Sequence, residues 1–348
     1  MLRPIFFAAI GEYFVGKRKP VRSTAYNVPS AMAPFHPCPF FPFPIQQMIL
    51  SRVLRVPTVP FTKNIIEFAD GTKCRLDVAT NDKKKNKVVV ICPGFGGSVK
   101  SPYCHHMAHA ALKSGYAVVV YNRRAHVPES VSPTYPLHYD GRDMNDVLAW
   151  IEKTFPDVTR ENLYGIGVSG GGNTLLKYAG EAGSSCAFKA IVSVCNGLDI
   201  DKVVRQFDAS DALINGIITS FTRDVLANVD GFRPEADLGT TTSMRELEKR
   251  ALQEFNDMNF MDNDMTKYYD SMSSARVIDR ITVPSLCICS DDDVLFAHPH
   301  EYYLDMIRTN PLISVFVTSH GGHAGYVDRS FGCDWWCKNA LTFLESCS

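Results

Sequence analysis

Residues 163–171 read Leu-Tyr-Gly-Ile-Gly-Val-Ser-Gly-Gly, which predicts a buried strand, a sharp turn at Ser169 and the start of a helix. The last five residues match Gly-x-Ser-x-Gly, and the helix-like segment 173–178 follows them. Between a strand and a helix, this pattern is typical of a nucleophile elbow, a turn that lifts a serine hydroxyl above the edge of a sheet. Glycines at 167 and 171 leave room for the strained backbone of such a turn. Ser169 is therefore a candidate nucleophile.

A second glycine-rich stretch, Cys-Pro-Gly-Phe-Gly-Gly-Ser, occupies residues 92–98. Glycine-rich turns also bind phosphates, but this stretch fits neither G-x-G-x-x-G nor a loop that ends in Gly-Lys-Ser/Thr. It directly follows the apolar run 88–92, so we interpret it as a loop whose backbone stabilises an oxyanion. The donors would be the N–H groups of Phe95 and of Gly170, the residue after the candidate nucleophile.

The composition excludes several classes of protein. The 348 residues are 45% hydrophobic and 21% charged, which favours a sizeable core over disorder. The formal net charge of −1 argues against a nucleic-acid partner. Eleven cysteines with irregular spacing match no zinc-ligand pattern and favour a reducing compartment. We therefore expect neither a metal nor another cofactor.

The N-terminal region differs from the rest of the chain. Residues 1–60 look irregular and aromatic-rich, and segment 35–44 is too rich in proline for a regular helix. Residues 4–15 are mostly apolar but too short to cross a bilayer, and basic residues follow at 17–19, so a peripheral membrane contact is one alternative there. We divide the chain into this extension and a main domain, 61–348, and expect a cytoplasmic or peripherally membrane-associated protein.

Strands and helices alternate along the main domain, which predicts an α/β fold with a mostly parallel central sheet flanked by helices. Asp70-Gly71 indicates a hairpin that precedes the alternation. The alternation of strands and helices stops at about 199–276. Helix-like segments there predict a helical cap or lid, or else a plain peripheral helical layer. The predicted strands are 88–92, 117–121, 163–168, 190–194, 285–289 and 313–318, and the predicted helices are 105–114, 143–155 and 172–180.

A serine nucleophile needs a base, and the base needs an acid that orients it. In this arrangement of strands the expected chain order is serine, acid, histidine. Three aspartates, 291–293, follow one predicted strand, and we choose Asp293 as the acid, with Asp292 as the alternative. His323 follows a glycine pair after the last predicted strand and is the preferred base, with His320 as the alternative.

Several segments together resemble one branch of the α/β-hydrolase superfamily. The branch includes bacterial carboxylesterases, yeast medium-chain ethyl ester synthases, and mammalian membrane-associated lipases and phospholipases. The similarity runs from about residue 36 to the C-terminus. The matching segments are Tyr-Asn-Arg-Arg at 121–124, the serine motif at 167–171, Tyr-Ala-Gly-Glu-Ala-Gly at 178–183, Ser-Val-Cys-Asn-Gly-Leu-Asp at 193–199, Tyr-Tyr-Asp-Ser at 268–271, the aspartates at 291–293 and Gly-Gly-His-Ala-Gly-Tyr at 321–326.

The resemblance implies an α/β-hydrolase fold, a triad of Ser169, Asp293 and His323, an oxyanion hole of Phe95 and Gly170, and activity on acyl esters. Three departures from the family pattern bear on the substrate range. Pro-Gly at 93–94 replaces the common His-Gly, valine replaces the proline usual at 294, and alanine replaces glycine at 125.

Three functions fit these residues. The first is a serine esterase or lipase that hydrolyses lipid-like acyl esters through an acyl-enzyme. The second uses the same triad to transfer the acyl group to an alcohol. The third is a lipid-binding protein of the hydrolase fold without turnover. In each case the partner is a small-molecule acyl ester or lipid, and the sequence does not fix the oligomeric state.

Overall fold

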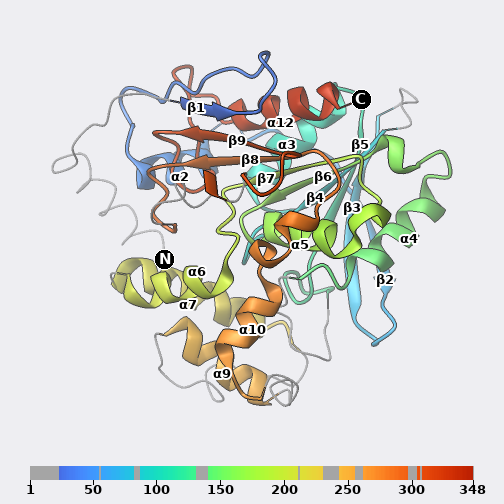
Figure 1. Ribbon diagram of the computed structural model, residues 1–348, viewed down its shortest axis with the longest axis vertical. Helices are drawn as coiled ribbons and strands as arrows, with labels where there is room; N and C mark the ends of the chain where they lie inside the picture. The colour runs from blue at the N-terminus through green and yellow to red at the C-terminus, as the bar shows by residue number, and fades with distance from the viewer. Residues whose placement is uncertain are drawn as a thin grey trace.

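A mixed nine-stranded sheet forms the centre of the part of the chain that is described (Figure 1). The computed structural model describes residues 23–54, 56–81, 87–130, 140–210, 212–229, 243–254, 262–296, 304–305 and 308–347. The strand order is β1-β9-β8-β7-β6-β4-β5-β3-β2. The strands are β1 (Ser23–Tyr26), β2 (Thr62–Glu67), β3 (Lys73–Ala79), β4 (Val88–Cys92), β5 (Ala117–Asn122), β6 (Leu163–Val168), β7 (Ala190–Val194), β8 (Ser285–Ser290) and β9 (Ile313–Thr318).

The sheet is parallel through its centre and antiparallel at its edges. Strands β5, β4, β6, β7, β8 and β9 pair in parallel, in that spatial order. The hairpin of β2 and β3 continues the sheet from β5 in the antiparallel sense, and Gly71 has φ 81° in its turn. The prediction of a mostly parallel α/β sheet is confirmed. The continuous apolar runs predicted the central strands because these strands are buried on both faces.

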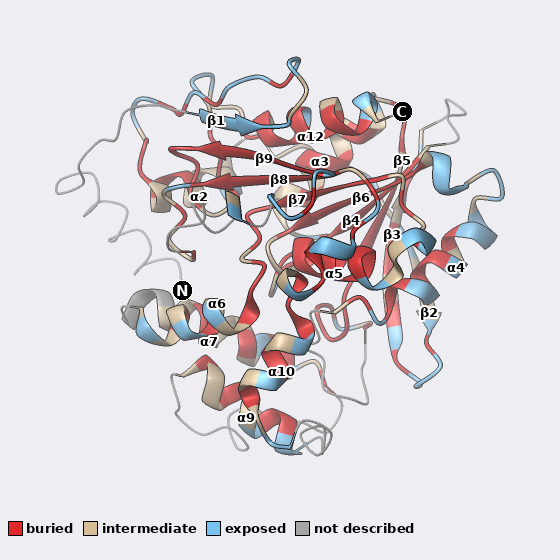
Figure 2. Ribbon diagram, viewed as in Figure 1, coloured by how far each residue is buried: buried red, intermediate tan, exposed pale blue. Residues whose placement is uncertain are grey.

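Two helical layers cover the sheet. Val89 and Ile91 of β4 pack on the side of α3 and α12, whereas Val88 and Val90 pack on the side of α4 and α5. Figure 2 shows the resulting buried strands and the half-buried helices around them. The helices are α2 (Pro44–Val53), α3 (Pro102–Lys113), α4 (Met144–Thr154), α5 (Gly170–Ala182), α6 (Ile200–Ala209), α7 (Ala212–Leu226), α9 (Met244–Glu254), α10 (Met265–Met272) and α12 (Trp335–Ser346), with short 3-10 turns at Arg160–Asn162, Gly183–Ser185, Ser274–Arg276 and Ile278–Arg280.

The segment between β7 and β8 forms a separate helical group. Helices α6, α7, α9 and α10 share a core of their own, and Figure 1 shows them together below the sheet. Tyr268 and Tyr269 of α10 are fully buried in that core. This helical group lies between β7 and β8, at the point where the sequence pattern stops alternating between strands and helices.

The N-terminal residues that are described join the main fold. Strand β1 pairs antiparallel with β9 and extends the sheet by one strand. Helix α2 begins at Pro44, as expected for proline in a first helical turn, and packs against α3. The expected membrane contact at 4–15 lies outside the described residues. Within the described ranges, no helix is both long and apolar enough to cross a bilayer.

Candidate active site

Ser169 lies in a strained turn between β6 and α5. Its φ of 54° and ψ of −124° are rarely adopted by an L-residue with a side chain. The N–H of Ser169 donates to the carbonyl of Val194 (2.7 Å), which ties the turn to the neighbouring strand β7. A Cβ on Gly171 would lie 2.0 Å from the carbonyl oxygen of Cys92, and one on Gly167 would lie 2.4 Å from that of Gly171. The motif therefore needs glycine at both positions for steric reasons.

The structure brings Asp293 and His323 into direct contact. Asp293 follows β8 and His323 follows β9, and these neighbouring parallel strands end at the same edge of the sheet. The distance from Asp293 Oδ2 to His323 Nδ1 is 2.8 Å, and Asp293 Oδ1 accepts a hydrogen bond from the N–H of Leu295 (2.9 Å). Because Nδ1 is engaged by the carboxylate, Nε2 is the nitrogen that can act as a base.

The alternative residues have other contacts. Asp292 Oδ1 accepts a hydrogen bond from the N–H of Gly322 (2.8 Å), so this carboxylate holds the loop that carries the histidine. His320 is buried, and its Nδ1 lies 2.8 Å from the hydroxyl of the preceding serine. The structure therefore joins Asp293, rather than Asp292, to the predicted base.

Cys195, which the sequence identified only as a small core residue, lies beside this pair. Ligand atoms of Cys195, Asp293 and His323 all lie within 4.8 Å of one another, a grouping that could hold a metal ion. The Cys195 Sγ also accepts a hydrogen bond from the N–H of Ala324 (3.3 Å). Burial, with the nearby Asp293 charge, raises the pKa of the Cys195 thiol well above its usual value. Because its sulfur accepts the hydrogen bond from the residue after His323, we interpret Cys195 as a support for the histidine loop.

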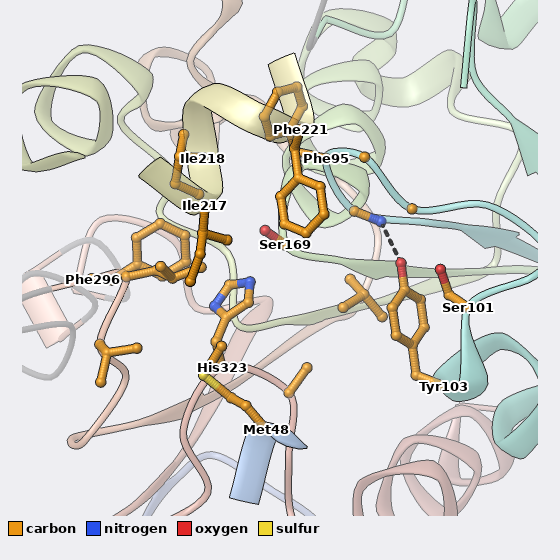
Figure 3. A pocket seen from close by; sticks show the side chains of 18 of the residues that line it. Met48, Phe95, Ser101, Tyr103, Ser169, Ile217, Ile218, Phe221, Phe296 and His323 are labelled. Atoms are coloured by element: carbon orange, nitrogen blue, oxygen red, sulfur yellow. Dashed lines mark hydrogen bonds between the residues drawn. The ribbon is translucent and has the colours of Figure 1, made fainter. Parts of the chain in front are cut away.

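The loop between β4 and α3 is fixed close to the serine. A Cβ on Gly94 would lie 3.1 Å from the Cβ of Ser169, so only glycine fits this approach comfortably. The N–H of Gly94 donates to Tyr103 Oη (3.0 Å), as Figure 3 shows, and the N–H of Val99 donates to Asn122 Oδ1 (2.8 Å). The role of Tyr103 has no signal in the sequence, because a tyrosine at a helix usually packs into the core.

A cavity of about 460 Å³ joins the predicted residues (Figure 3). Ser169, Gly170, Phe95 and His323 all line it, and Asp293 lies behind His323. The walls come from α2, α6, α7 and the start of α9, the loop after β4 and the loops after β8 and β9. Their apolar side chains are Ile45, Met48, Ile49, Val53, Ile200, Val203, Val204, Phe207, Ile217, Ile218, Phe221, Met244, Val294, Leu295 and Phe296.

Helix α7 contacts the loop after β4 directly. A Cβ on Gly96 would lie 3.1 Å from the ring of Phe221, so this helix packs on the backbone next to Phe95. In Figure 3, Phe221 lies above Ser169, and Ile217 and Ile218 lie to the left of it. The helices of the segment between β7 and β8 thus form one wall of the cavity.

Comparisons with known proteins agree with this architecture. The model of the α/β hydrolase fold matches residues 87–330. Phospholipase ABHD3 of Bos taurus is 27% identical over 303 residues, which cover 81% of this chain and 70% of that protein. Monoacylglycerol lipase ABHD2 of Danio rerio is 27% identical over 261 residues, 69% of this chain and 60% of that protein.

Solved structures show the same fold at low sequence identity. The esterase Pf2001 of Pyrococcus furiosus has a TM-score of 0.56 at 16% identity, and the match covers 85% of this chain and 98% of the esterase. Est1E of Butyrivibrio proteoclasticus, solved with ferulic acid bound, has a TM-score of 0.54 at 15% identity over 81% of this chain and 98% of its own. The strand order, the turn at Ser169 and the match to the family model together show that the chain belongs to the α/β hydrolase fold family.

Proposed function

We propose that this protein is a serine carboxylic ester hydrolase that acts on lipid-like acyl esters. The Ser169 hydroxyl attacks the ester carbonyl, and His323 Nε2 takes its proton and returns it to the leaving alcohol. Asp293 holds the imidazole in the required tautomer and stabilises its positive charge. The N–H groups of Phe95 and Gly170 stabilise the oxyanion, and water then releases the acid from the acyl-enzyme.

One observation carries the proposal. The 2.8 Å contact between His323 Nδ1 and Asp293 Oδ2 occurs at the same cavity as a serine held at φ 54°. A histidine with a purely structural role would not require a strained serine at the same cavity. Backbone strain of about 1–3 kcal/mol persists where the surroundings enforce it, commonly at active sites. A nucleophile, a base and an acid at one cavity are the parts that acyl transfer requires.

The walls of the cavity support a lipid-like substrate. They are mostly aliphatic and aromatic, as in sites that enclose an acyl chain. The relatives named phospholipase and monoacylglycerol lipase agree with an acyl ester of a glycerol-based alcohol. In this proposal the segment 199–276 serves as the cap that excludes water from the chain, and α2 closes the opposite wall.

Turnover of p-nitrophenyl esters of increasing acyl length tests the proposal. The wild-type protein should release p-nitrophenol, and Ser169→Ala should lower kcat by at least about 10⁴-fold because the acyl-enzyme cannot form. Added ethanol separates hydrolysis from transfer, since transfer would convert most of the acyl group to its ethyl ester. Folded wild-type protein without turnover on any chain length would overturn the proposal.

A further inference from the structure

The cavity has two chemically different ends. Helices α6 and α7 line one end with apolar side chains, and in Figure 3 Ile217, Ile218 and Phe221 lie on that side of Ser169. Ser101 and Tyr103 lie on the other side of Ser169 in the same view. Two cations also line the cavity: Lys100, which directly precedes Ser101, and Arg52 from α2, the helix that packs against α3.

The two cations come from neighbouring segments of the fold and are both exposed. Arg52 is in the last turn of α2, Lys100 stands two residues before α3 begins, and the two helices pack against each other. Both side chains are exposed to solvent although they line the cavity, so they stand where it opens. The N-terminus of the twelve-residue helix α3 faces the same region through Ser101, Pro102 and Tyr103, and its dipole adds positive potential.

No carboxylate neutralises this end. Among the residues that the structure describes, Asp and Glu are absent from the lining of the cavity. Within the same ranges, neither Arg52 nor Lys100 makes an ion pair, although eighteen other ion pairs are present. This end therefore presents positive charge that an anionic ligand would neutralise.

We propose that Arg52 and Lys100 form a subsite for an anionic group on the alcohol part of the acyl ester. The inference rests on the proposed esterase function: the acyl chain lies under α6 and α7, the ester carbonyl at Ser169, and the alcohol at the cationic end. A phosphate monoester and a carboxylate share the chemistry that guanidinium and ammonium groups recognise. Hydrolysis then releases a fatty acid and an anionic alcohol.

Four esters with one common acyl chain test the subsite in the wild-type protein. They are 1-acylglycerol, 1-acylglycerol 3-phosphate, the acyl ester of glyceric acid, and acylcholine. At low salt, kcat/KM for the phosphate ester should exceed that for 1-acylglycerol by about tenfold, the effect of two partly exposed charge contacts. The carboxylate ester should lie between them, acylcholine should be the poorest, and added NaCl should reduce the preference.

Charge variants assign the preference to these residues. The double variant Arg52→Gln with Lys100→Gln should bring the ratio of phosphate to neutral ester close to one. Arg52→Glu with Lys100→Glu should favour acylcholine over the phosphate ester. Lys113→Gln, an exposed cation at the far end of α3, should keep the wild-type ratio.

The outcomes separate the subsite from the catalytic proposal. Wild-type protein that hydrolyses all four esters at equal kcat/KM would overturn the subsite and leave the esterase standing. A preference for anionic esters that survives both double variants would also overturn it. Failure to hydrolyse any of the four, or the p-nitrophenyl esters, would instead reject the esterase. The salt dependence of the wild-type ratio needs no variant and tests the subsite even if a variant fails to fold.

Discussion

Three residues with positive φ lie at or beside the proposed catalytic residues. Ser169, Cys195 and Ala324 have φ values of 54°, 48° and 57°; the first two directly follow β6 and β7, and Ala324 directly follows His323. Each such residue costs about 1–3 kcal/mol and persists only where the surroundings enforce it. Here hydrogen bonds enforce them: the N–H of Ser169 is bound by the carbonyl of Val194, and that of Ala324 by the Cys195 sulfur. These residues thus lower the folding stability, and they hold the serine and the histidine in a fixed geometry.

The two neighbouring aspartates should differ sharply on substitution. Asp293→Asn removes the charge that faces His323 and favours the wrong imidazole tautomer, so kcat should fall by about 10³–10⁴-fold with little change in KM. Asp292→Asn changes a group that binds the backbone of Gly322, so its main effect should be on stability. Steady-state kinetics with urea unfolding distinguishes the two. A larger loss of kcat for Asp292→Asn would show that the acid is misassigned.

His126 should make the fold sensitive to acid. Its Nε2 lies 3.2 Å from the Arg123 guanidinium and its Nδ1 lies 2.7 Å from the carbonyl of Arg124. Burial, and then the charge of Arg123, lowers the pKa of His126 to about 3. The unfolded chain takes up a proton below about pH 6.5 and the folded chain does not, so stability falls as the pH drops, by about 2 kcal/mol at pH 5.

Urea unfolding at pH 8 and pH 5 measures this contribution. In His126→Gln, the difference in unfolding free energy between the two pH values should be about 2 kcal/mol smaller than in wild type. His36→Gln, at an exposed position, should keep the wild-type difference. An unchanged pH dependence in His126→Gln would show that this histidine is not buried as a neutral group.

At the scale of elements, the elbow depends on the close approach of α5 to β4. A Cβ on Gly171 would meet two backbone oxygens, 2.0 Å from Cys92 and 2.6 Å from Pro93, which cannot move aside as a flexible side chain can. Gly171→Ala should therefore cost about 3 kcal/mol or more in unfolding free energy. Gly216→Ala, in open space on α7, should stabilise by about 0.5–1 kcal/mol. Equal stability of the two variants would contradict the described packing.

The central elements could be predicted because their sequences have local signals. Strands buried on both faces appear as continuous apolar runs, and β4, β6, β7 and β9 begin and end at the predicted residues. Strand β1 could not be predicted in this way. Its four residues have no apolar pattern, and its place depends on pairing with β9, almost 300 residues away along the chain. A short edge strand is specified by its partner rather than by its own sequence.

At the scale of the whole molecule, residues of the N-terminal segment line the cavity of the candidate active site. Gln47 of α2 is fully buried, and its Oε1 accepts a hydrogen bond from the N–H of Val327 (2.6 Å) beyond the histidine loop. Its Nε2 donates to the carbonyl of Phe41 (2.7 Å). A division of the chain at residue 60 would separate these groups. The sequence could not reveal the contact, because a single glutamine carries no signal for a partner 280 residues away.

Phe35 tests whether this segment is a packed part of the molecule. Its ring lies 5.2 Å from that of Tyr326 and 5.0 Å from that of Trp335, and it is 1% exposed. Phe35→Ala should cost about 3–5 kcal/mol. Phe40→Ala removes the same side chain at a position that is 65% exposed and should change stability by less than about 0.5 kcal/mol. Similar unfolding midpoints for both variants would mean that the segment does not pack as described.

The sequence also predicted the candidate catalytic residues, because each follows a predicted strand at the edge where ligands bind in such sheets. It did not predict what surrounds them. Cys195, Tyr103 and Gln47 look like ordinary core or helix residues in the sequence, and their contacts to the site arise only from the packing of distant segments.

Labelling with a fluorophosphonate, followed by peptide mass spectrometry, tests the central claim most directly, because the probe reacts covalently with an activated serine. We predict a single modified residue, Ser169, with no label in Ser169→Ala and much slower labelling in His323→Ala. Folded wild-type protein that takes up no label at Ser169, or His323→Ala that reacts as fast as wild type, would contradict the proposed catalytic site.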